Sequence, residues 1–304
     1  MTDLDPAAGR QVPAVGAALW LRGRQVAHGR AAVMAVVNRT SDSFYPAARA
    51  GSTTAAVAAV EAAVAQGADV VDIGGVRAGR GPEVSAAEEI DRVAPVVAAV
   101  RDQFPDLPIS VDTWRSEVAE AVADVGADLL NDTWAGVDPA LVSVASRRGL
   151  GVVVSHTGGA APRTDPLRVQ YPGGVLADVL ARLASGAELA VAAGVDPRSV
   201  LVDPTHDFGK NTWHSLELLR STDAVVALGY PTLMALSRKD FVGESLDLAV
   251  EERLEGTLAS TAVAAWLGAS VVRAHDVLAT RRVLEMVAVV RGDLAPARAV
   301  RGLA

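Results

Sequence analysis

The feature that most constrains the fold of this chain is a regular alternation of short apolar runs with long alanine-rich segments of helical period. Runs of Val, Ile and Leu that are apolar along their whole length predict strands covered on both faces, as parallel strands with helical crossovers are. We count eight such runs, each followed by one predicted helix. The strands are expected at 32–37, 69–73, 109–111, 128–130, 151–155, 200–202, 232–235 and 270–273.

Eight strand-helix units favour closure into an α/β (β/α)8 TIM barrel over an open doubly wound sheet. Gly67, Gly126, Gly194 and Gly268 each end a predicted helix just before a strand, where a left-handed residue is needed. We expect an N-terminal tail and barrel-bottom plug at 1–30, the barrel at 31–293 and a C-terminal tail at 294–304. The helices are expected at 52–66, 85–104, 115–125, 138–148, 174–193, 212–222, 251–267 and 277–292.

Length, charge and cysteine content narrow the functional classes. The 304 residues suit one barrel domain, and the net charge of -8 without a basic run argues against a nucleic-acid partner. No segment approaches the roughly 18 uninterrupted apolar residues of a membrane span. The absence of cysteine excludes disulfides and thiolate metal sites, so we expect a cytoplasmic protein without a membrane partner.

Polar residues end every predicted strand, and active sites of (β/α)8 barrels lie at these C-terminal ends. A single Asp or Asn there could simply cap the following helix. Eight polar strand ends together predict a pocket for a planar ligand with many hydrogen-bond donors and acceptors. Arg273 and His275 predict a second region for an anionic part of the ligand. The strand ends carry Asn38, Asp72, Asp112, Asn131 with Asp132, His156, Asp203, the segment Ser237-Arg238-Lys239, and Arg273 with His275.

Other interpretations of these residues remain open. The glycine-rich loop 74–81 could supply N–H groups and cations to an anion, or be a surface loop. His156 and His275 could bind zinc, but they lack a helical HxxxH-type spacing. No GxSxG turn is present, which disfavours a serine hydrolase. Phe44 is a candidate lid residue, whereas Trp114 and Trp134 are expected to pack at the barrel rim.

The polar strand ends resemble those of dihydropteroate synthase, which couples a dihydropterin pyrophosphate to p-aminobenzoate. The resemblance spans about residues 31–292 and keeps the order and spacing of its motifs. The matching segments are MAVVNRTSDSF (34–44), DIGG (72–75), ISVDT (109–113), Asn131-Asp132, Asp203-Pro204 with Phe208-Gly209-Lys210, Ser237-Arg238-Lys239, and Arg273 with His275-Asp276.

The resemblance implies a site divided between the pterin ring and its pyrophosphate. Asp112, Asn131, Asp203 and Lys239 would hold the pterin. Asn38, Arg273 and His275 would hold the pyrophosphate and Mg²⁺, with Asn38 as the metal ligand. Lys239, Arg273 and His275 would then be the catalytic residues. The resemblance also implies a homodimer, and no strong protein nucleophile is needed because the amine attacks once pyrophosphate leaves.

The chain departs from the family pattern at the rim of this pocket. Positions 76–81 read VRAGRG where the family has ESTRPG, so the Thr and Arg of that loop are missing. Asp240 replaces a Ser that lies near the p-aminobenzoate carboxylate, and would repel that carboxylate unless Arg77 or Arg80 compensates. The segment 203–210 reads DPTHDFGK where the family has DPGxGFGK. This pattern resembles a divergent second copy in some actinobacteria, which lacks ordinary synthase activity.

Three functional hypotheses follow. The chain is a dihydropteroate synthase-like transferase of folate-biosynthesis type that uses p-aminobenzoate or another amine, or it is a catalytically inactive pterin-binding paralogue with a non-folate or regulatory role. A weaker third hypothesis is a methyl-tetrahydrofolate methyltransferase, which shares the barrel and the pterin pocket. The first-loop and SRK matches favour the synthase over the methyltransferase.

Overall fold

The computed structural model describes residues 16–38, 53–163 and 169–301. Its central element is a sheet of eight parallel strands in the order β8-β7-β6-β5-β4-β3-β10-β9. A parallel bridge between Val202 and Thr232 brings β8 against β9 and closes the sheet into a (β/α)8 barrel. The strands are β3 (Ala32–Asn38), β4 (Val70–Gly74), β5 (Ile109–Asp112), β6 (Leu129–Asp132), β7 (Gly151–Ser155), β8 (Val200–Asp203), β9 (Leu233–Ala235) and β10 (Val271–Ala274).

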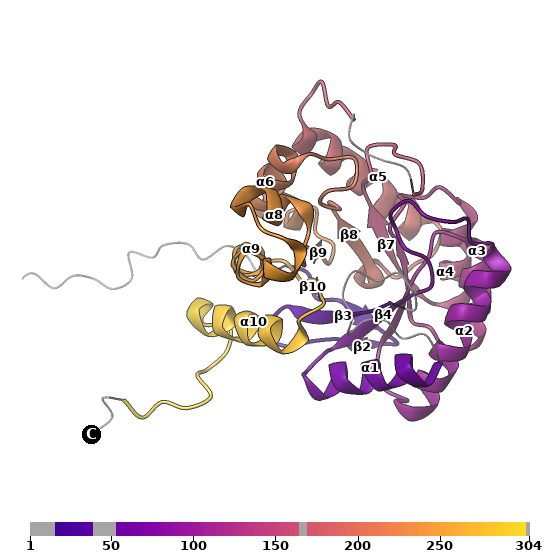
Figure 1. Cartoon of the computed structure of the whole chain (residues 1–304), viewed down its shortest axis with the longest axis horizontal. Helices are drawn as coiled ribbons and strands as arrows, with labels where there is room; N and C mark the ends of the chain where they lie inside the picture. Colours follow the sequence, from indigo (N-terminus) through magenta and orange to yellow (C-terminus); the bar gives the residue numbers. More distant parts are fainter. Residues whose placement is uncertain (1–15, 39–52, 164–168, 302–304) are drawn as a thin grey trace, which may run out of the picture.

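Helices surround these strands, as Figure 1 shows. The longer helices pack apolar residues against the strands, and α2 begins with a capping box in which Ser85 and Glu88 satisfy each other's backbone N–H groups. The helices are α1 (Thr53–Ala65), α2 (Ala86–Gln103), α3 (Ser116–Asp124), α4 (Ala140–Arg148), α5 (Val175–Ala192), α6 (Thr212–Arg220), α7 (Thr222–Val226), α8 (Asp240–Leu246), α9 (Leu254–Trp266) and α10 (Val277–Arg291), with short 3-10 turns at Pro197–Ser199 and Val250–Glu252.

The structure confirms the predicted barrel and adds two helices. The four glycines expected past helix ends all have left-handed φ values, between 94° at Gly67 and 104° at Gly194. The helix expected at 212–222 ends at Arg220, because Ser221 leaves helical geometry, and α7 follows it. Helix α8 was not expected. Its sequence DFVGESL contains Gly and Ser and has too few residues to show a helical period.

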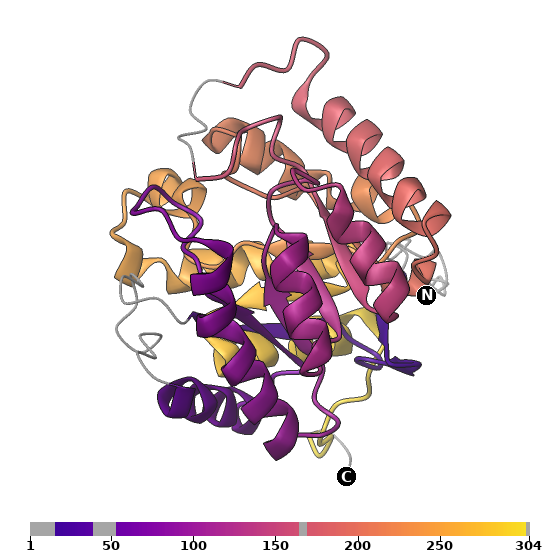
Figure 2. The same ribbon diagram turned by 90° about the vertical axis from the view of Figure 1, so that its right-hand side faces the viewer.

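The barrel interior is apolar at its N-terminal half. Met34, Leu129, Leu201 and Leu233 are fully buried there, and Leu19 from the segment before the first barrel strand packs on them. That segment includes a two-stranded hairpin, β1 (Trp20–Leu21) with β2 (Arg24–Gln25). Figure 2 shows the hairpin, in indigo, at one edge of the molecule. Because the N-terminal half is filled, a polar ligand can enter the barrel only from the C-terminal ends of the strands.

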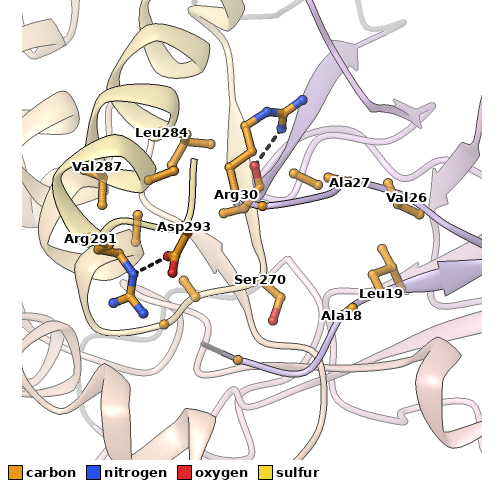
Figure 3. A pocket seen from close by; sticks show the side chains of 18 of the residues that line it. Ala18, Leu19, Val26, Ala27, Arg30, Ser270, Leu284, Val287, Arg291 and Asp293 are labelled. Atoms are coloured by element: carbon orange, nitrogen blue, oxygen red, sulfur yellow. Dashed lines mark hydrogen bonds and ion pairs between the residues drawn. The ribbon is translucent and has the colours of Figure 1, made fainter. Parts of the chain in front are cut away.

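A cavity of about 300 Å³ lies at the N-terminal end, between residues 16–32 and helices α9 and α10. Figure 3 shows Leu19, Val26, Leu284 and Val287 around it, with Arg291 paired to Asp293. This cavity is mainly apolar and lies away from the polar strand ends. No helix in the described part of the chain is long and apolar enough to cross a membrane.

Candidate functional site

Four neighbouring strands bring a row of predicted site residues together. Strand register places Asn38 opposite Gly74, Gly74 opposite Asp112, and Asp112 opposite Asn131. A Cβ atom on Gly74 would lie 3.4 Å from Asn38 Oδ1 and 3.6 Å from Asp112 Cβ. Glycine at this position therefore leaves the space between the amide and the carboxylate open.

A buried hydrogen-bond network centred on Asp72 underlies this row. The Asp72 side chain is fully buried and accepts hydrogen bonds from Ser110 Oγ at 2.6 Å, Asn131 Nδ2 at 3.0 Å and Arg273 Nε at 2.7 Å. A buried carboxylate is tolerated when it is paired and hydrogen-bonded in this way. Asp72 was noted as a polar strand end but was not included among the predicted site residues. A carboxylate inside the apolar run VVDIG was the signal that could have identified it.

Arg273 joins the two halves of the predicted site. Its Nη2 donates to Asp112 Oδ2 at 3.1 Å while its Nε donates to Asp72. Thr133 Oγ1 donates to the other Asp112 oxygen at 2.9 Å. Burial raises the pKa of Asp112 to about 7, although the Arg273 guanidinium opposes that shift. The predicted anion-binding arginine thus spans the two carboxylates.

Lys239 and Asp203 lie close enough to interact electrostatically with each other and with Arg273. Asp203 ends β8, opposite Ser155, and its carboxylate accepts the backbone N–H of Thr205 at 2.7 Å. Lys239 is the N-cap residue of α8 and its Nζ donates to the backbone oxygen of His206. Burial lowers the pKa of Lys239, against the carboxylates of Asp207 and Asp203. A buried ammonium beside carboxylates can redistribute its hydrogen bonds when a polar ligand arrives.

The loop from β8 to α6 is held in place by Lys210. Its Nζ donates to three backbone oxygens, those of His156 at 2.7 Å, Thr205 at 3.0 Å and Phe208 at 2.9 Å. Burial lowers the pKa of Lys210 to about 7. The Phe208 ring, fixed by this loop, lies 5.1 Å from Lys239 Nζ. The loop therefore supports the position of Lys239.

His275 lies beside this network and is neutral at neutral pH. Its Nδ1 lies 3.0 Å from Ser237 Oγ, which also accepts the backbone N–H of His275. Burial lowers the pKa of His275 to about 4, and Arg273 contributes to the shift. His275 can therefore hydrogen-bond an anion without adding a positive charge. Arg238 is mainly structural, since its guanidinium pairs with Asp276 at 3.0 Å and fixes the start of α10.

Two contacts involve the rim positions at which this sequence departs from the family pattern. Asp240 pairs with Arg253 Nη1 at 2.9 Å, a cation that the sequence had not singled out. Arg163, in the loop after β7, donates to the backbone oxygens of Gly79 at 3.2 Å and Pro82 at 2.6 Å. The glycine-rich loop 74–81 is thus anchored by another loop at the rim.

Metal-binding capacity is limited in the ranges that the structure describes. They contain no group of three or more His, Cys, Asp and Glu side chains that could hold a metal ion. His156 instead lies 2.7 Å from Asp178 through its Nε2, so the zinc interpretation gains no support. Asn38 offers one amide oxygen beside Gly74, and an amide oxygen suits Mg²⁺ when phosphate and water supply its other ligands. Phe44 lies outside the described residues.

Comparison with known proteins agrees with this geometry. Residues 34–275 match the family described as pterin binding enzyme. The chain is 56% identical over 287 residues to a protein of Mycobacterium leprae named inactive dihydropteroate synthase 2, covering 93% of this chain and 99% of the relative. It is 36% identical over 256 residues to the dihydropteroate synthase of Bacillus subtilis, covering 84% and 86%.

A solved structure extends the match to the whole barrel. The dihydropteroate synthase of Yersinia pestis superposes with a TM-score of 0.84 at 32% identity, covering 91% of this chain and 100% of that one. Family match, sequence identity and fold agree over the residues that build the site. The chain therefore belongs to the pterin binding enzyme family and is a dihydropteroate synthase-like protein.

Proposed function

We propose that this protein binds a dihydropterin pyrophosphate and transfers the pterin to an amine, as a dihydropteroate synthase-type transferase with an altered acceptor side. The observation that carries the proposal is the network in which Arg273 spans Asp72 and Asp112 beside Asn131. It places carboxylate and amide groups, which suit a pterin edge, next to a guanidinium that suits its pyrophosphate.

Each predicted site residue has a role in this proposal. Asp112, Asn131 and Asp203 would accept from or donate to the pterin edge, together with Lys239. Arg273 and neutral His275 would bind the pyrophosphate and stabilise its negative charge as it leaves. Asn38 would hold Mg²⁺ together with pyrophosphate oxygens, and the ion would neutralise charge on the leaving group. The amine itself is the nucleophile in this reaction, so no nucleophilic side chain of the protein is needed.

The test is pyrophosphate release by the purified protein. Protein, Mg²⁺ and 6-hydroxymethyl-7,8-dihydropterin pyrophosphate are mixed with p-aminobenzoate or with a panel of other primary amines. We expect release with at least one amine and loss of release in Arg273→Met. No release above the amine-free reaction with any amine would overturn the transferase.

A catalytically inactive pterin-binding protein is the second candidate. The name of the M. leprae relative, inactive dihydropteroate synthase 2, and the altered rim favour it. Calorimetry with 6-hydroxymethylpterin separates the candidates when it is read together with the pyrophosphate-release assay, because an inactive paralogue binds the pterin but releases no pyrophosphate from the pterin pyrophosphate. Failure to bind any pterin would contradict both.

We also propose that the protein is a cytoplasmic homodimer that associates through α9 and α10. These two helices lie side by side in Figure 1. They carry five of the large apolar side chains that are exposed in the described chain, which is more than any other pair of neighbouring helices carries. The five are Val263, Trp266, Leu278, Met286 and Val290. The cytoplasmic location fits a chain that has no cysteine for disulfides.

A further inference from the structure

The loop after β8 places the carboxylate of Asp207 against the start of α8. Asp207 Oδ2 accepts the backbone N–H groups of Asp240 at 2.7 Å and Phe241 at 3.3 Å. Asp207 Oδ1 accepts from Ser215 Oγ at 3.0 Å, and Ser215 Oγ accepts the Asp207 N–H at 3.1 Å. Both carboxylate oxygens are therefore held, and these two N–H groups of α8 are already occupied by the protein itself.

This arrangement is maintained against backbone strain. Asp207 has a φ of 69°, in the left-handed region that favours glycine. Such a conformation costs a non-glycine residue on the order of 1 kcal/mol, and strained residues concentrate at functional sites. Glycine would adopt the same backbone without strain but would carry no carboxylate. The hydrogen bonds of the Asp207 carboxylate to the α8 N–H groups and to Ser215 offset this strain.

The carboxylates of Asp207 and Asp240 both lie near Lys239. Lys239 Nζ donates to the backbone oxygen of His206, the residue before Asp207. Burial lowers the pKa of Lys239, while the carboxylates of Asp207, Asp203 and Asp240 act in the opposite direction. The Asp240 side chain is 77% exposed and pairs with Arg253 through one oxygen. The rim beside Lys239 thus carries two carboxylates, of which Asp240 is paired with Arg253, and the N–H groups of Asp240 and Phe241 are already satisfied.

We propose that Asp207 and Asp240 determine acceptor specificity by rejecting amines that carry a carboxylate and admitting amines in which that group is neutral. This inference rests on the proposed function, because it concerns the second substrate of that reaction. In the proposed function Arg273 binds the pyrophosphate, and Asp240 stands where the family pattern has a Ser near the p-aminobenzoate carboxylate, so the acceptor would approach along the Lys239 side. A carboxylate there would meet two like charges, which disfavours binding.

Three ligands separate the inference from the proposed function. 6-Hydroxymethylpterin reports on the pterin pocket alone. Pteroate adds a benzoate, and pteroamide replaces that carboxylate with a neutral carboxamide of nearly equal size. Calorimetry with the full-length protein is expected to show pteroamide binding on the order of tenfold more tightly than pteroate, a difference of about 1.4 kcal/mol. The affinity for 6-hydroxymethylpterin is the internal reference.

Matched variants test which residues set the ratio of the affinities for pteroamide and pteroate. Asp207→Asn keeps an oxygen for the α8 N–H groups and suits a left-handed φ, so it removes charge while keeping the fold. Combined with Asp240→Asn, it should bring the two affinities within about twofold of each other. Asp207→Gly, which also relieves the strain, should shift the ratio in the same direction. Asp102→Asn, an exposed charge removal on α2, should leave the ratio unchanged.

The possible results distinguish a failure of this inference from a failure of the proposed function. Equal affinities in the unaltered protein, or a preference for pteroate, would overturn the inference while leaving the pterin pocket established. A tenfold preference that persists in the double variant would also overturn it, because other residues would then be responsible. If 6-hydroxymethylpterin and both conjugates fail to bind, the proposed function fails, and the inference fails with it.

Discussion

Asp72 shows how one buried side chain organises the polar end of this barrel. Its two oxygens accept hydrogen bonds from Ser110, Asn131 and Arg273, so the orientation of the Arg273 side chain depends on Asp72. The carboxylate touches two of the residues assigned to ligand binding and is itself fully buried. We regard it as a positioning residue for Arg273.

Asp72→Asn should destabilise the protein by about 3 kcal/mol, because it removes one partner of a buried ion pair while Arg273 keeps Asp112 as a second. The free energy of unfolding in urea, followed by circular dichroism, measures this change. Asp102→Asn removes an exposed charge and should stay within about 0.5 kcal/mol of the unaltered protein. A loss below about 1 kcal/mol in Asp72→Asn would show that the network contributes little to stability.

The affinity for pterin should rise with pH up to neutrality. The pKa of Asp112 is raised to about 7, so below this pH the group is protonated and must release its proton before it can accept two ligand N–H groups. We expect about tenfold tighter binding per pH unit below pH 7 and a plateau above it. Fluorescence titration with 6-hydroxymethylpterin between pH 5.5 and 8.5 measures the profile. Asp112→Asn should bind weakly and without this slope, and an identical slope in that variant would refute the assignment.

Among the structural elements, the loop from β8 to α6 connects the strand ends to the start of α8. It includes Thr205 and Asp207 at positive φ, and it contacts α8 through Asp207 and Lys239. Lys210 fixes the loop from inside, and Tyr171 Oη donates to the Gly209 oxygen at 2.8 Å. A loop fastened at these points holds the two carboxylates beside Lys239 in one arrangement.

Lys210→Met should loosen this loop. Methionine fills a similar space but leaves three backbone oxygens without their shared donor, at a cost of about 3 kcal/mol in unfolding free energy. Amide hydrogen exchange should speed up over residues 204–211 while the N-terminal half of the barrel stays protected. Arg282→Met, at an exposed position on α10, is the control. Unchanged exchange in the loop would contradict the anchoring role of Lys210.

Helix α8 illustrates what element prediction misses. Its seven residues include Gly243 and Ser245, and its N-terminal N–H groups are satisfied by Asp207, a residue 33 positions earlier. A segment this short is stabilised by tertiary contacts more than by its own sequence. The long α2 was predictable because its capping box and apolar period are both local.

At the scale of the whole molecule, the apolar side chains on α9 and α10 predict self-association. The unaltered chain should sediment with twice its 31.3 kDa mass, and the double variant Met286→Glu, Val290→Glu should sediment as a monomer, because two charges would be buried in the interface. Leu189→Glu on α5 changes an equally exposed leucine elsewhere and should remain a dimer. A dimeric double variant, measured by analytical ultracentrifugation, would place the interface on another face.

Sequence periodicity was enough to predict the eight barrel strands, the eight helices that alternate with them and the polar residue at each strand end. Those properties depend on periodicity and on residue types that lie close together in the chain. It therefore predicted the (β/α)8 barrel and placed Asp112, Asn131, Asp203 and Arg273 at the same end. The division into tail, barrel and C-terminal tail stays a prediction, as do the ligand roles of these residues.

Tertiary structure alone decided how those residues pair. Arg273 meets Asp72 across 201 positions of sequence, and Asp207 reaches the start of α8 only because β8 and β9 are neighbours in the closed barrel. The pKa of Asp112 likewise depends on burial and on an arginine from another strand. Such contacts follow from strand register and barrel closure, which local residue patterns do not specify. They turn a set of polar strand ends into a network that spans the mouth of the barrel, with two carboxylates beside Lys239.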